Sequence, residues 1–255
     1  SLRPRVNMLK TIVINFMLMP FKHALHFPIV IYGPCKLGRL RGKVSFRSSL
    51  RTGMLKIGIS DPVRSFHNKS FVNIDGNLEI GNNVVLRRGI NLCVKTNSHV
   101  VLEDDVYIGD NNTIISFKFI KFCHATRVGN NSVFMDSDFH YVININTREV
   151  KINNKPIEIG DNCWIGGWCT IKKGTKLPKG SIVAGPYAMT SKDYTNKIAE
   201  CSLIAGAPAK LIVEGIRRIN NDKSDIIIKE FYKNNKDTFV LPENVELDDF
   251  CMPKS

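Results

Sequence analysis

The segment Asp136-Ser137-Asp138-Phe139-His140 contains the residue types that general base catalysis needs. A histidine has an unperturbed pKa of about 6.5, so its imidazole can accept a proton at neutral pH. A neighbouring carboxylate can orient the ring and make it more basic, and Asp136 and Asp138 are both candidates for that carboxylate. The spacing alone favours a plainer interpretation, in which His140 is a surface histidine beside two solvated aspartates.

A six-residue period on both sides of this segment predicts the elements that position it. Helices bring apolar residues inward every three or four positions and strands every second position, so a sustained period of six fits neither. It predicts a coil of three short flat faces, with an aliphatic residue of each face inside and Gly, Asn, Asp or Pro at the corners. A β-sandwich with turns at similar spacing is the alternative. The aliphatic residues in this register are Ile74, Ile80, Leu86, Leu92, Leu102, Ile108, Ile114, Val128, Phe134, Ile159, Ile165, Ile171, Leu177, Val183 and Met189.

The period is interrupted twice, and the longer interruption contains His140. The step from Leu92 to Leu102 predicts a small excursion of the coil. Residues from about 136 to 156 contain no hexads, and a loop of that length without structure of its own is usually functional or disordered. We therefore expect the chemistry in the longer loop.

Length, charge and cysteine content narrow the class of protein. A chain of 255 residues is within the range of one all-β domain with short terminal pieces. The formal charge of +13 indicates an anionic partner, such as a phosphorylated cofactor, an acidic glycan or an anionic membrane surface. No nucleic-acid-binding signature accompanies this charge. The seven cysteines are scattered without CxxC pairs, which favours reduced cytoplasmic thiols over disulfides or zinc.

The two ends of the chain lack hexads. The stretch Met8–Tyr32 is apolar, but lysines and prolines interrupt it, so we expect neither a membrane span nor a cleavable signal peptide. We expect it to cap the open end of the coil, and it also allows a peripheral membrane contact through Phe16, Leu18, Phe21 and Phe27. Beyond Leu211, apolar residues from Ile216 to Phe231 predict one or two amphipathic helices, and a loose acidic tail is expected from Leu241.

Three motifs together resemble the hexapeptide-repeat acyltransferases, and within them the sugar O-acetyltransferases that act on maltose, galactosides, capsular polysaccharide and lipopolysaccharide. The motifs are Asp-Ser-Asp-Phe-His at 136–140, Lys-Pro-Ile-Glu-Ile-Gly-Asp-Asn-Cys-Trp-Ile-Gly at 155–166, and Ile-Ala-Gly-Ala-Pro-Ala-Lys at 204–210. The resemblance is strong over about residues 128–213. It implies an all-β fold, a left-handed parallel β-helix of hexapeptide repeats with an N-terminal cap and a short C-terminal helical extension. The expected units are a cap at 1–50, a catalytic coil at 51–213 and an extension at 214–255.

The resemblance also implies roles for individual residues. His140 would be the general base that deprotonates the acceptor hydroxyl as it attacks the thioester of acetyl-CoA, with Asp138 or Asp136 holding the imidazole. The backbone N–H of Gly167 would stabilise the oxyanion. The implied CoA-binding residues are Trp164, Ala184, Gly185, Thr190, Lys192, Ala205, Gly206 and Lys210, and the implied acceptor-binding residues are Arg148, Lys155 and Trp168. No metal is implied.

The chain departs from the family pattern after the sixth hexad, where Pro186 removes a backbone donor near the expected CoA site. The family forms trimers with the site between neighbouring coils, so the resemblance implies a homotrimer, located in the cytoplasm or at the inner face of the membrane. N-acylation of an amino sugar nucleotide is one alternative function. A non-catalytic β-solenoid that only binds a ligand is another, and the six histidines do not show the zinc set of a γ-class carbonic anhydrase.

Overall fold

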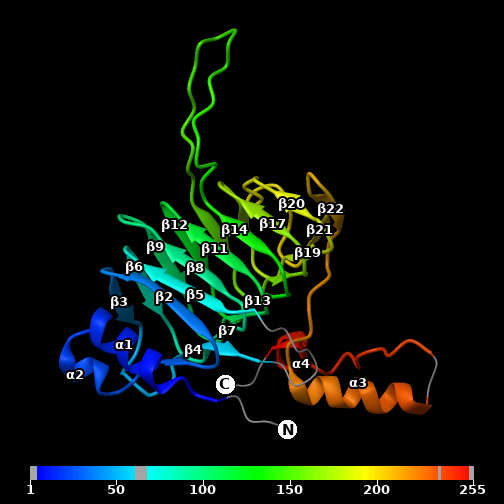
Figure 1. The fold of residues 1–255 in the computed structure, drawn as a ribbon. Coiled ribbons are helices and arrows are strands. Elements are labelled where there is room, and N and C mark those ends of the chain that lie inside the picture. Colours follow the sequence, from blue (N-terminus) through cyan, green and yellow to red (C-terminus); the bar gives the residue numbers. More distant parts are fainter. Residues whose placement is uncertain (1–4, 61–67, 235–236, 253–255) are drawn as a thin grey trace.

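The structure is a computed structural model that describes residues 5–60, 68–234 and 237–252. Within these residues, successive strands from β1 to β20 pass in turn to three different sheets, so the chain winds as a three-sided coil (Figure 1). Every strand pairs in parallel with the strand one turn before or after it, except β22, which runs antiparallel to β21. The expected fold class, a left-handed parallel β-helix of hexapeptide repeats, is confirmed, and the alternative of a β-sandwich is wrong.

The three sheets have nine, seven and six strands. The nine-stranded sheet contains β1 (Ile29–Ile31), β4 (Leu55–Ile59), β7 (Val84–Arg87), β10 (Tyr107–Ile108), β13 (Arg127–Val128), β16 (Trp164–Ile165), β19 (Ile182–Ala184), β21 (Leu203–Ala205) and β22 (Lys210–Val213). The seven-stranded sheet contains β2 (Cys35–Leu40), β5 (Ser70–Ile74), β8 (Asn91–Val94), β11 (Thr113–Ser116), β14 (Val133–Met135), β17 (Thr170–Lys172) and β20 (Met189–Thr190). The six-stranded sheet contains β3 (Lys43–Phe46), β6 (Asn77–Ile80), β9 (His99–Leu102), β12 (Phe119–Phe122), β15 (Ile157–Ile159) and β18 (Lys176–Leu177).

The hexad residues line the inside of the coil, except Met189, which is 39 % exposed because β20 turns Thr190 inward in its place, opposite Ile171. Ile108, Ile165 and Ile171 are each 0 % exposed, because a residue at the centre of each short face points to the axis and contacts its counterparts one turn away. The excursion expected between Leu92 and Leu102 is present. Val72 pairs with Leu92 and Leu78 pairs with Val100, so a step of six residues becomes one of eight at the corner between β8 and β9.

Asparagines make many of the corners. Asn83, Asn111, Asn131 and Asn162 adopt positive φ values between 54° and 60°, a conformation that asparagine tolerates better than other residues with a side chain. The buried side chain of Asn112 donates to the carbonyls of Gly109 and Gly129 and links two successive turns of the coil. The turn-forming residues of the sequence therefore also carry hydrogen bonds along the coil.

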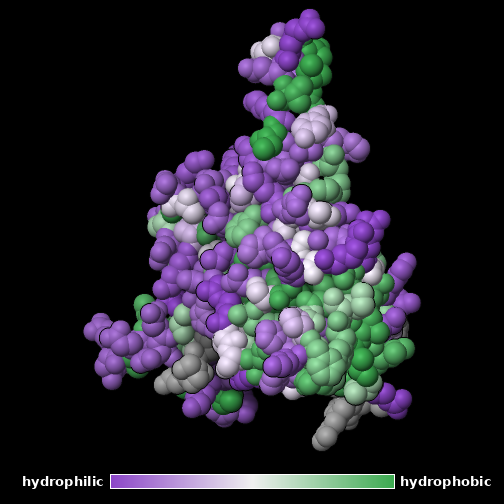
Figure 2. All heavy atoms as spheres, turned by 90° about the vertical axis from the view of Figure 1, so that its left-hand side faces the viewer, coloured by the Kyte–Doolittle hydropathy of each residue, from purple (hydrophilic) through white to green (hydrophobic). Residues whose placement is uncertain are grey.

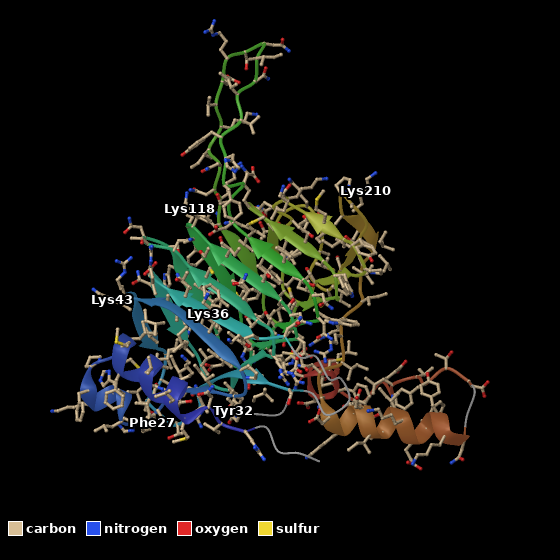
Figure 3. The ribbon with its side chains drawn as sticks, viewed as in Figure 1. Phe27, Tyr32, Lys36, Lys43, Lys118 and Lys210 are labelled. Carbon is tan, nitrogen blue, oxygen red and sulfur yellow. The ribbon has the colours of Figure 1, made fainter. Side chains whose placement is uncertain are left out.

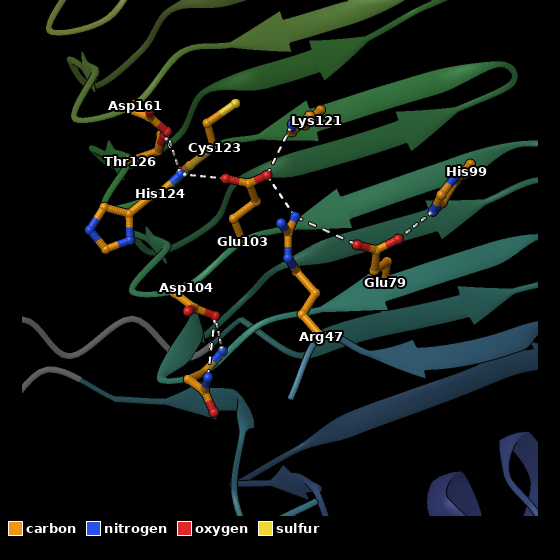
Figure 4. Close-up of polar contacts among 11 residues, drawn as sticks. Arg47, Glu79, His99, Glu103, Asp104, Lys121, Cys123, His124, Thr126 and Asp161 are labelled. Carbon is orange, nitrogen blue, oxygen red and sulfur yellow. Dashed lines mark hydrogen bonds and ion pairs between the residues drawn. The ribbon is translucent and has the colours of Figure 1, made fainter. Parts of the chain in front are cut away.

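A ladder of charged side chains crosses the outside of the six-stranded sheet (Figure 4). Arg47 lies 3.6 Å from Glu79 and 2.6 Å from Glu103, and Lys121 lies 3.0 Å from the same Glu103 carboxylate. Burial raises the pKa of Glu103, but its hydrogen bonds to Lys121 and Arg47 outweigh burial and hold the pKa below its usual value. The ladder thus keeps the stacked charges of successive turns paired.

Three possible metal ligands, Glu103, Cys123 and Asp161, come within 4.8 Å of one another beside this ladder. Glu103 and Asp161 both accept the backbone N–H of His124, at 3.0 and 3.1 Å. Burial raises the pKa of the Cys123 thiol to about 11, so the thiol stays protonated at neutral pH. We assign the group a structural role. All seven cysteines are free thiols in the structure.

Two helices, α1 (Met8–Leu18) and α2 (Phe21–Ala24), cover the first turn of the coil (Figure 1). The buried Asn15 amide donates to the carbonyl of Ile29 at 2.7 Å and accepts its N–H at 3.2 Å, while the Thr11 hydroxyl accepts the N–H of Ile31 at 3.0 Å. These bonds provide partners for the backbone N–H and C=O groups on the edge of β1, which would otherwise be unpaired. The expected cap is therefore present. No helix among the described residues is long and apolar enough to cross a bilayer.

The C-terminal part leaves the coil after β22 and forms α3 (Asp222–Asn234) and α4 (Leu247–Cys251). The amphipathic helix begins at Asp222 rather than at Ile216. The acidic end, expected to be a loose tail, contains α4, whose Phe250 and Cys251 are buried. The rings of Phe239 and Phe250 stack at 6.0 Å, and the Asn221 amide donates to the carbonyl of Asp249. Aromatic packing therefore orders the segment that its composition suggested was loose.

Candidate active site

Residues 136–156, called the arm below, leave the coil at the corner between β14 and β15 and project far from it (Figure 1). Antiparallel bridges join Ser137 to Asn154 and Ile143 to Val150, so the arm is a narrow hairpin rather than a loop without structure. Arg148 lies exposed near its tip with a φ of 60°. The arm therefore places Arg148 well away from the coil of its own chain.

Asp136 forms the base of the arm. Its side chain is 0 % exposed, and its carboxylate accepts the Ser116 hydroxyl at 2.9 Å and three backbone N–H groups from residues 117 to 119 at 2.7–2.9 Å. The backbone carbonyl of Asp136 also accepts the N–H of Lys155 at 3.0 Å, which closes the arm where it returns to the coil. Asp136 thus organises the corner from which the arm leaves.

Asp138 is held by two lysines of the next turn. Its carboxylate lies 2.6 Å from the Nζ atom of Lys173 and 3.6 Å from that of Lys172. The hydrogen bond from Lys173 is the main reason that the pKa of Asp138 lies below its usual value. Lys173 also donates to the carbonyl of Ile152 at 3.0 Å and so ties both sides of the arm to the coil.

His140 is exposed and lies two residues beyond this attachment. Its backbone N–H donates to the carbonyl of Asp138 at 2.7 Å, and the preceding Phe139 packs against Phe117 with ring centroids 5.1 Å apart. Among the described residues, no side chain forms a hydrogen bond with the imidazole. The imidazole borders a hollow of about 330 Å³ that also contains Asp138, Glu149, Lys151 and Lys173. Within one chain, His140 is therefore accessible and both nearby carboxylates have other partners.

A larger groove of about 790 Å³ lies on the nine-stranded sheet, at the end of the coil opposite to the cap. Its floor is backbone, because Gly166 and Gly185 approach so closely that a Cβ atom on Gly166 would lie 2.5 Å from the nitrogen of Gly185. Among the described residues, the N–H of Gly167 donates to no backbone carbonyl. The lining residues are Trp164, Gly166, Gly167, Trp168, Ile182, Val183, Ala184, Gly185, Pro186, Tyr187, Leu203, Ile216, Arg217 and Arg218.

One wall of the groove comes from the segment between β22 and α3. The guanidinium of Arg218 lies over the ring of Trp164, 5.7 Å from its centroid. Burial lowers the pKa values of both Arg127 and Arg218, and the positive charge of Arg218 lowers the pKa of Arg127 further. An arginine keeps its charge despite such shifts. The groove therefore combines a narrow backbone floor, three aromatic side chains and fixed positive charge at one side.

The sequence did not single out this wall. Ile216 was assigned to a helix, and Arg217 and Arg218 carry no hexad signal. Tyr187, in the segment that departs from the family pattern, stands exposed with its ring centroid 6.4 Å from that of Trp168. The only sequence signal for the wall is the pair of adjacent arginines directly after the coil.

The other residues implied by the resemblance lie in different places. Ala184 pairs with Ala205 across β19 and β21, next to the groove, and Gly206 follows on the exposed side. Lys192 and Lys210 are exposed (Figure 3 labels Lys210 at the far end of the coil). Thr190, by contrast, is 2 % exposed and its hydroxyl bonds to that of Tyr194 at 3.0 Å inside the coil. Its hydroxyl therefore does not face the groove.

Gly167 and His140 lie at two different corners of the coil. Gly167 follows β16 at the corner between the nine- and seven-stranded sheets, whereas the arm leaves between the seven- and six-stranded sheets. Lys173, which binds the foot of the arm, is six residues beyond Gly167, and a strand advances about 3.3 Å per residue, so the two corners are separated by the width of one face, at most about 20 Å. A proton transfer needs heavy atoms about 3 Å apart. One chain therefore does not bring its own His140 to its own Gly167.

No protein-family model matches the chain. It is 30 % identical over 113 residues to an uncharacterized 24.8 kDa protein in the cps region of Klebsiella pneumoniae; the match covers 44 % of this chain and 49 % of that one. The chain thus spans about half the length of the curated relative it matches.

The solved structures that are similar to the chain include two sialic acid polymer acetyltransferases. The polySia-specific acetyltransferase NeuO has a TM-score of 0.42 and 19 % identity, covering 82 % of this chain and 88 % of its own. The polysialic acid O-acetyltransferase OatWY has a TM-score of 0.42 and 19 % identity, covering 78 % of this chain and all of its own. The fold follows from the strand pairing of the chain itself. By its six-residue period and its three parallel sheets, the chain is a hexapeptide-repeat β-helix protein.

Proposed function

We propose that the chain is an acetyl-CoA-dependent O-acetyltransferase that modifies a sugar hydroxyl of a bacterial surface polysaccharide or of its precursor. One observation carries the proposal. The same coil has a projecting arm with a histidine whose imidazole forms no hydrogen bond among the described residues, and a groove whose floor is formed by backbone atoms. The three motifs around these features resemble those of the sugar O-acetyltransferases, and this resemblance indicates the type of reaction.

The groove fits the acyl donor. A pantetheine arm is narrow and polar along its length, and a floor of glycine and alanine backbone leaves room for it where larger side chains would fill the space. The guanidinium of Arg218 stands beside the groove and can pair with a phosphate of CoA. Lys192 and Lys210 are exposed on the same end of the coil and add positive charge.

The reaction needs one proton transfer and one oxyanion site. His140 takes the proton of the acceptor hydroxyl while the oxygen attacks the thioester carbonyl carbon, which forms a C–O bond. The N–H of Gly167 donates to the carbonyl oxygen as it becomes negative. When the C–S bond breaks, the thiolate of CoA leaves and takes the proton from the imidazolium. Atoms and charge balance, and no metal takes part.

Because one chain keeps these two groups at different corners, we propose that the site lies between copies of a homotrimer. The arm of one coil would place His140 at the groove of its neighbour, and Arg148 and Lys155 would then face the acceptor together with Trp168. A neighbour could also supply the carboxylate that orients the imidazole, since Asp136 is engaged in its own corner and Asp138 with Lys173.

The test is the release of free thiol from acetyl-CoA with candidate glycans, measured for the wild type and for His140→Ala. Loss of a general base is expected to lower the rate about 10²- to 10⁴-fold. His26→Ala is the matched control, because His26 is also exposed but lies at the capped end. A full rate in His140→Ala with the best acceptor would overturn the assignment. Transfer only to amino groups of sugar nucleotides would instead identify an N-acyltransferase.

A mixing experiment tests whether the site lies between copies. Chains carrying His140→Ala and chains carrying Ala184→Phe, which fills the groove, should each be inactive. Random mixed trimers would contain sites that combine an intact His140 with an intact groove, and about one quarter of the wild-type activity should return. No recovery, with mixed trimers verified by mass, would place both groups in one chain.

A further inference from the structure

The side of helix α1 that faces away from the coil is largely apolar. Ile14 and Asn15 face the coil and are 0 % exposed. On the opposite side, Leu9 is 68 % and Met17 60 % exposed, with Ile12 and Phe16 between them. A helix that packs on one side only would ordinarily carry polar residues on the other.

The exposed apolar surface continues onto α2. Phe21 is 67 % and Leu25 53 % exposed, and the ring of Phe16 lies 5.6 Å from that of Phe21. Figure 2, which views this end of the molecule, shows apolar side chains gathered low on the face. We call this surface the cap face and define it by six residues, Leu9, Ile12, Phe16, Met17, Phe21 and Leu25. Leu18, which was also expected in a membrane contact, is only 6 % exposed because it faces the coil. Contiguous apolar patches of this kind mark interaction sites.

The cap and the first strands of the coil contribute charge of a single sign. The first 60 residues contain five lysines and six arginines and no aspartate or glutamate. Arg39, Arg41 and Arg47 pair with acidic residues of later turns. Lys10 and Lys22 lie on the cap itself, and Figure 3 shows Lys36 and Lys43 on the neighbouring strands. Within the described part of the chain, none of these four lysines forms an ion pair.

From this arrangement we infer that the cap face docks on an anionic lipid bilayer. An apolar helix face buried at the level of the headgroups, with lysines around it, is the pattern of an interfacial helix, and each lysine near an anionic surface adds to the affinity. A second copy of the chain would bring two positively charged rims together, which opposes association. A nucleic acid would use the charge but leave the apolar residues in water.

Docking by this face leaves the groove in water. β16 lies five strand positions from β1 in the nine-stranded sheet, which at about 4.8 Å per strand is about 24 Å. The inference does not depend on the proposed function, because no residue of the cap face belongs to the arm or to the groove.

The test is sedimentation of the full chain with vesicles of phosphatidylcholine, with and without phosphatidylglycerol. We expect binding to the mixed vesicles that falls as salt is raised, and much weaker binding to phosphatidylcholine alone. The double variant Ile12→Glu and Phe16→Glu should bind at least tenfold more weakly. The matched control, Ile226→Glu and Ile227→Glu, changes two exposed apolar residues of α3 and should bind as the wild type does.

A charge variant keeps the inference testable if the first variant unfolds. Lys22→Glu and Lys36→Glu should bind the mixed vesicles at least tenfold more weakly, whereas Lys179→Glu and Lys223→Glu, also exposed, should have little effect. Equal binding by wild type and both cap variants would overturn the inference. So would self-association of the wild type that Ile12→Glu abolishes without any vesicle binding, because the cap face would then be an interface between proteins.

Discussion

The carboxylate of Asp138 lies 2.6 Å from the ammonium group of Lys173, and this ion pair attaches the arm to the next turn of the coil. Asp138 is two residues from His140 in the sequence, yet its partner lies 35 positions later, in the turn directly after β17. The pair therefore sets the point from which His140 extends.

Replacing Lys173 by Met should weaken this attachment. The pKa of Asp138 is lowered in the folded chain, mainly by its hydrogen bond to Lys173, so the pair stabilises the folded state above the unfolded pKa of 3.8. This contribution is lost as the pH falls through the lower, folded pKa. Since the pair is partly exposed, we expect the variant to lose about 0.2–1 kcal/mol at pH 7. Urea unfolding at pH 7 and below pH 3 measures the difference in stability between the wild type and the variant at each pH. An equal difference at both pH values would contradict a stabilising ion pair.

Replacing Asp136 by Ala should be much more damaging. The variant leaves the Ser116 hydroxyl and three backbone N–H groups without their buried acceptor. We expect a loss of about 3–5 kcal/mol in the free energy of unfolding, because each unsatisfied buried donor is costly. Asp138→Ala, measured in the same urea titration, is the control and should lose no more than about 1 kcal/mol. Similar losses in the two variants would show that Asp136 does not organise the corner.

Replacing Arg218 by Ala should weaken binding of CoA about tenfold, because a charge-assisted hydrogen bond to a phosphate is worth about 1.5 kcal/mol or more. The ring of Trp164 would also lose the guanidinium above it. Isothermal titration with CoA measures the change without need of an acceptor. Arg217→Ala is the comparison, since Arg217 pairs with Asp248 at 2.6 Å, and its loss should affect affinity less. An unchanged affinity in Arg218→Ala would exclude this wall from the CoA site.

The buried cysteines should resist alkylation in the folded chain. Burial raises the pKa of the Cys163 thiol to about 12 and those of Cys35 and Cys169 to about 11. The reactive thiolate is therefore scarce at pH 8, and the sulfurs are also covered. Mass spectrometry after iodoacetamide treatment should find these three unmodified without urea and modified in urea. Rapid labelling of Cys163 without urea would mean that this part of the coil opens readily.

Much of the fold can be predicted from the sequence because each inward position of the coil repeats after six residues. Ile165 and Ile171 are buried in the structure for the reason that makes them periodic: each meets an equivalent residue one turn away. The absence of hexads from 136 to 156 can also be recognised in the sequence, because an arm that leaves the coil has no positions that point into the core.

The partners of the charged residues depended on the tertiary structure. Asp136 and Asp138 look equivalent beside His140 in the sequence, but one caps a buried corner and the other pairs with Lys173 on the surface. Arg218 reaches Trp164 only because the chain beyond β22 folds back along the groove. In a coil, hydrogen-bond and ion-pair partners lie a turn or more apart along the chain. The six-residue period shows which side chains point inward, and the packing of successive turns decides which outward side chains meet.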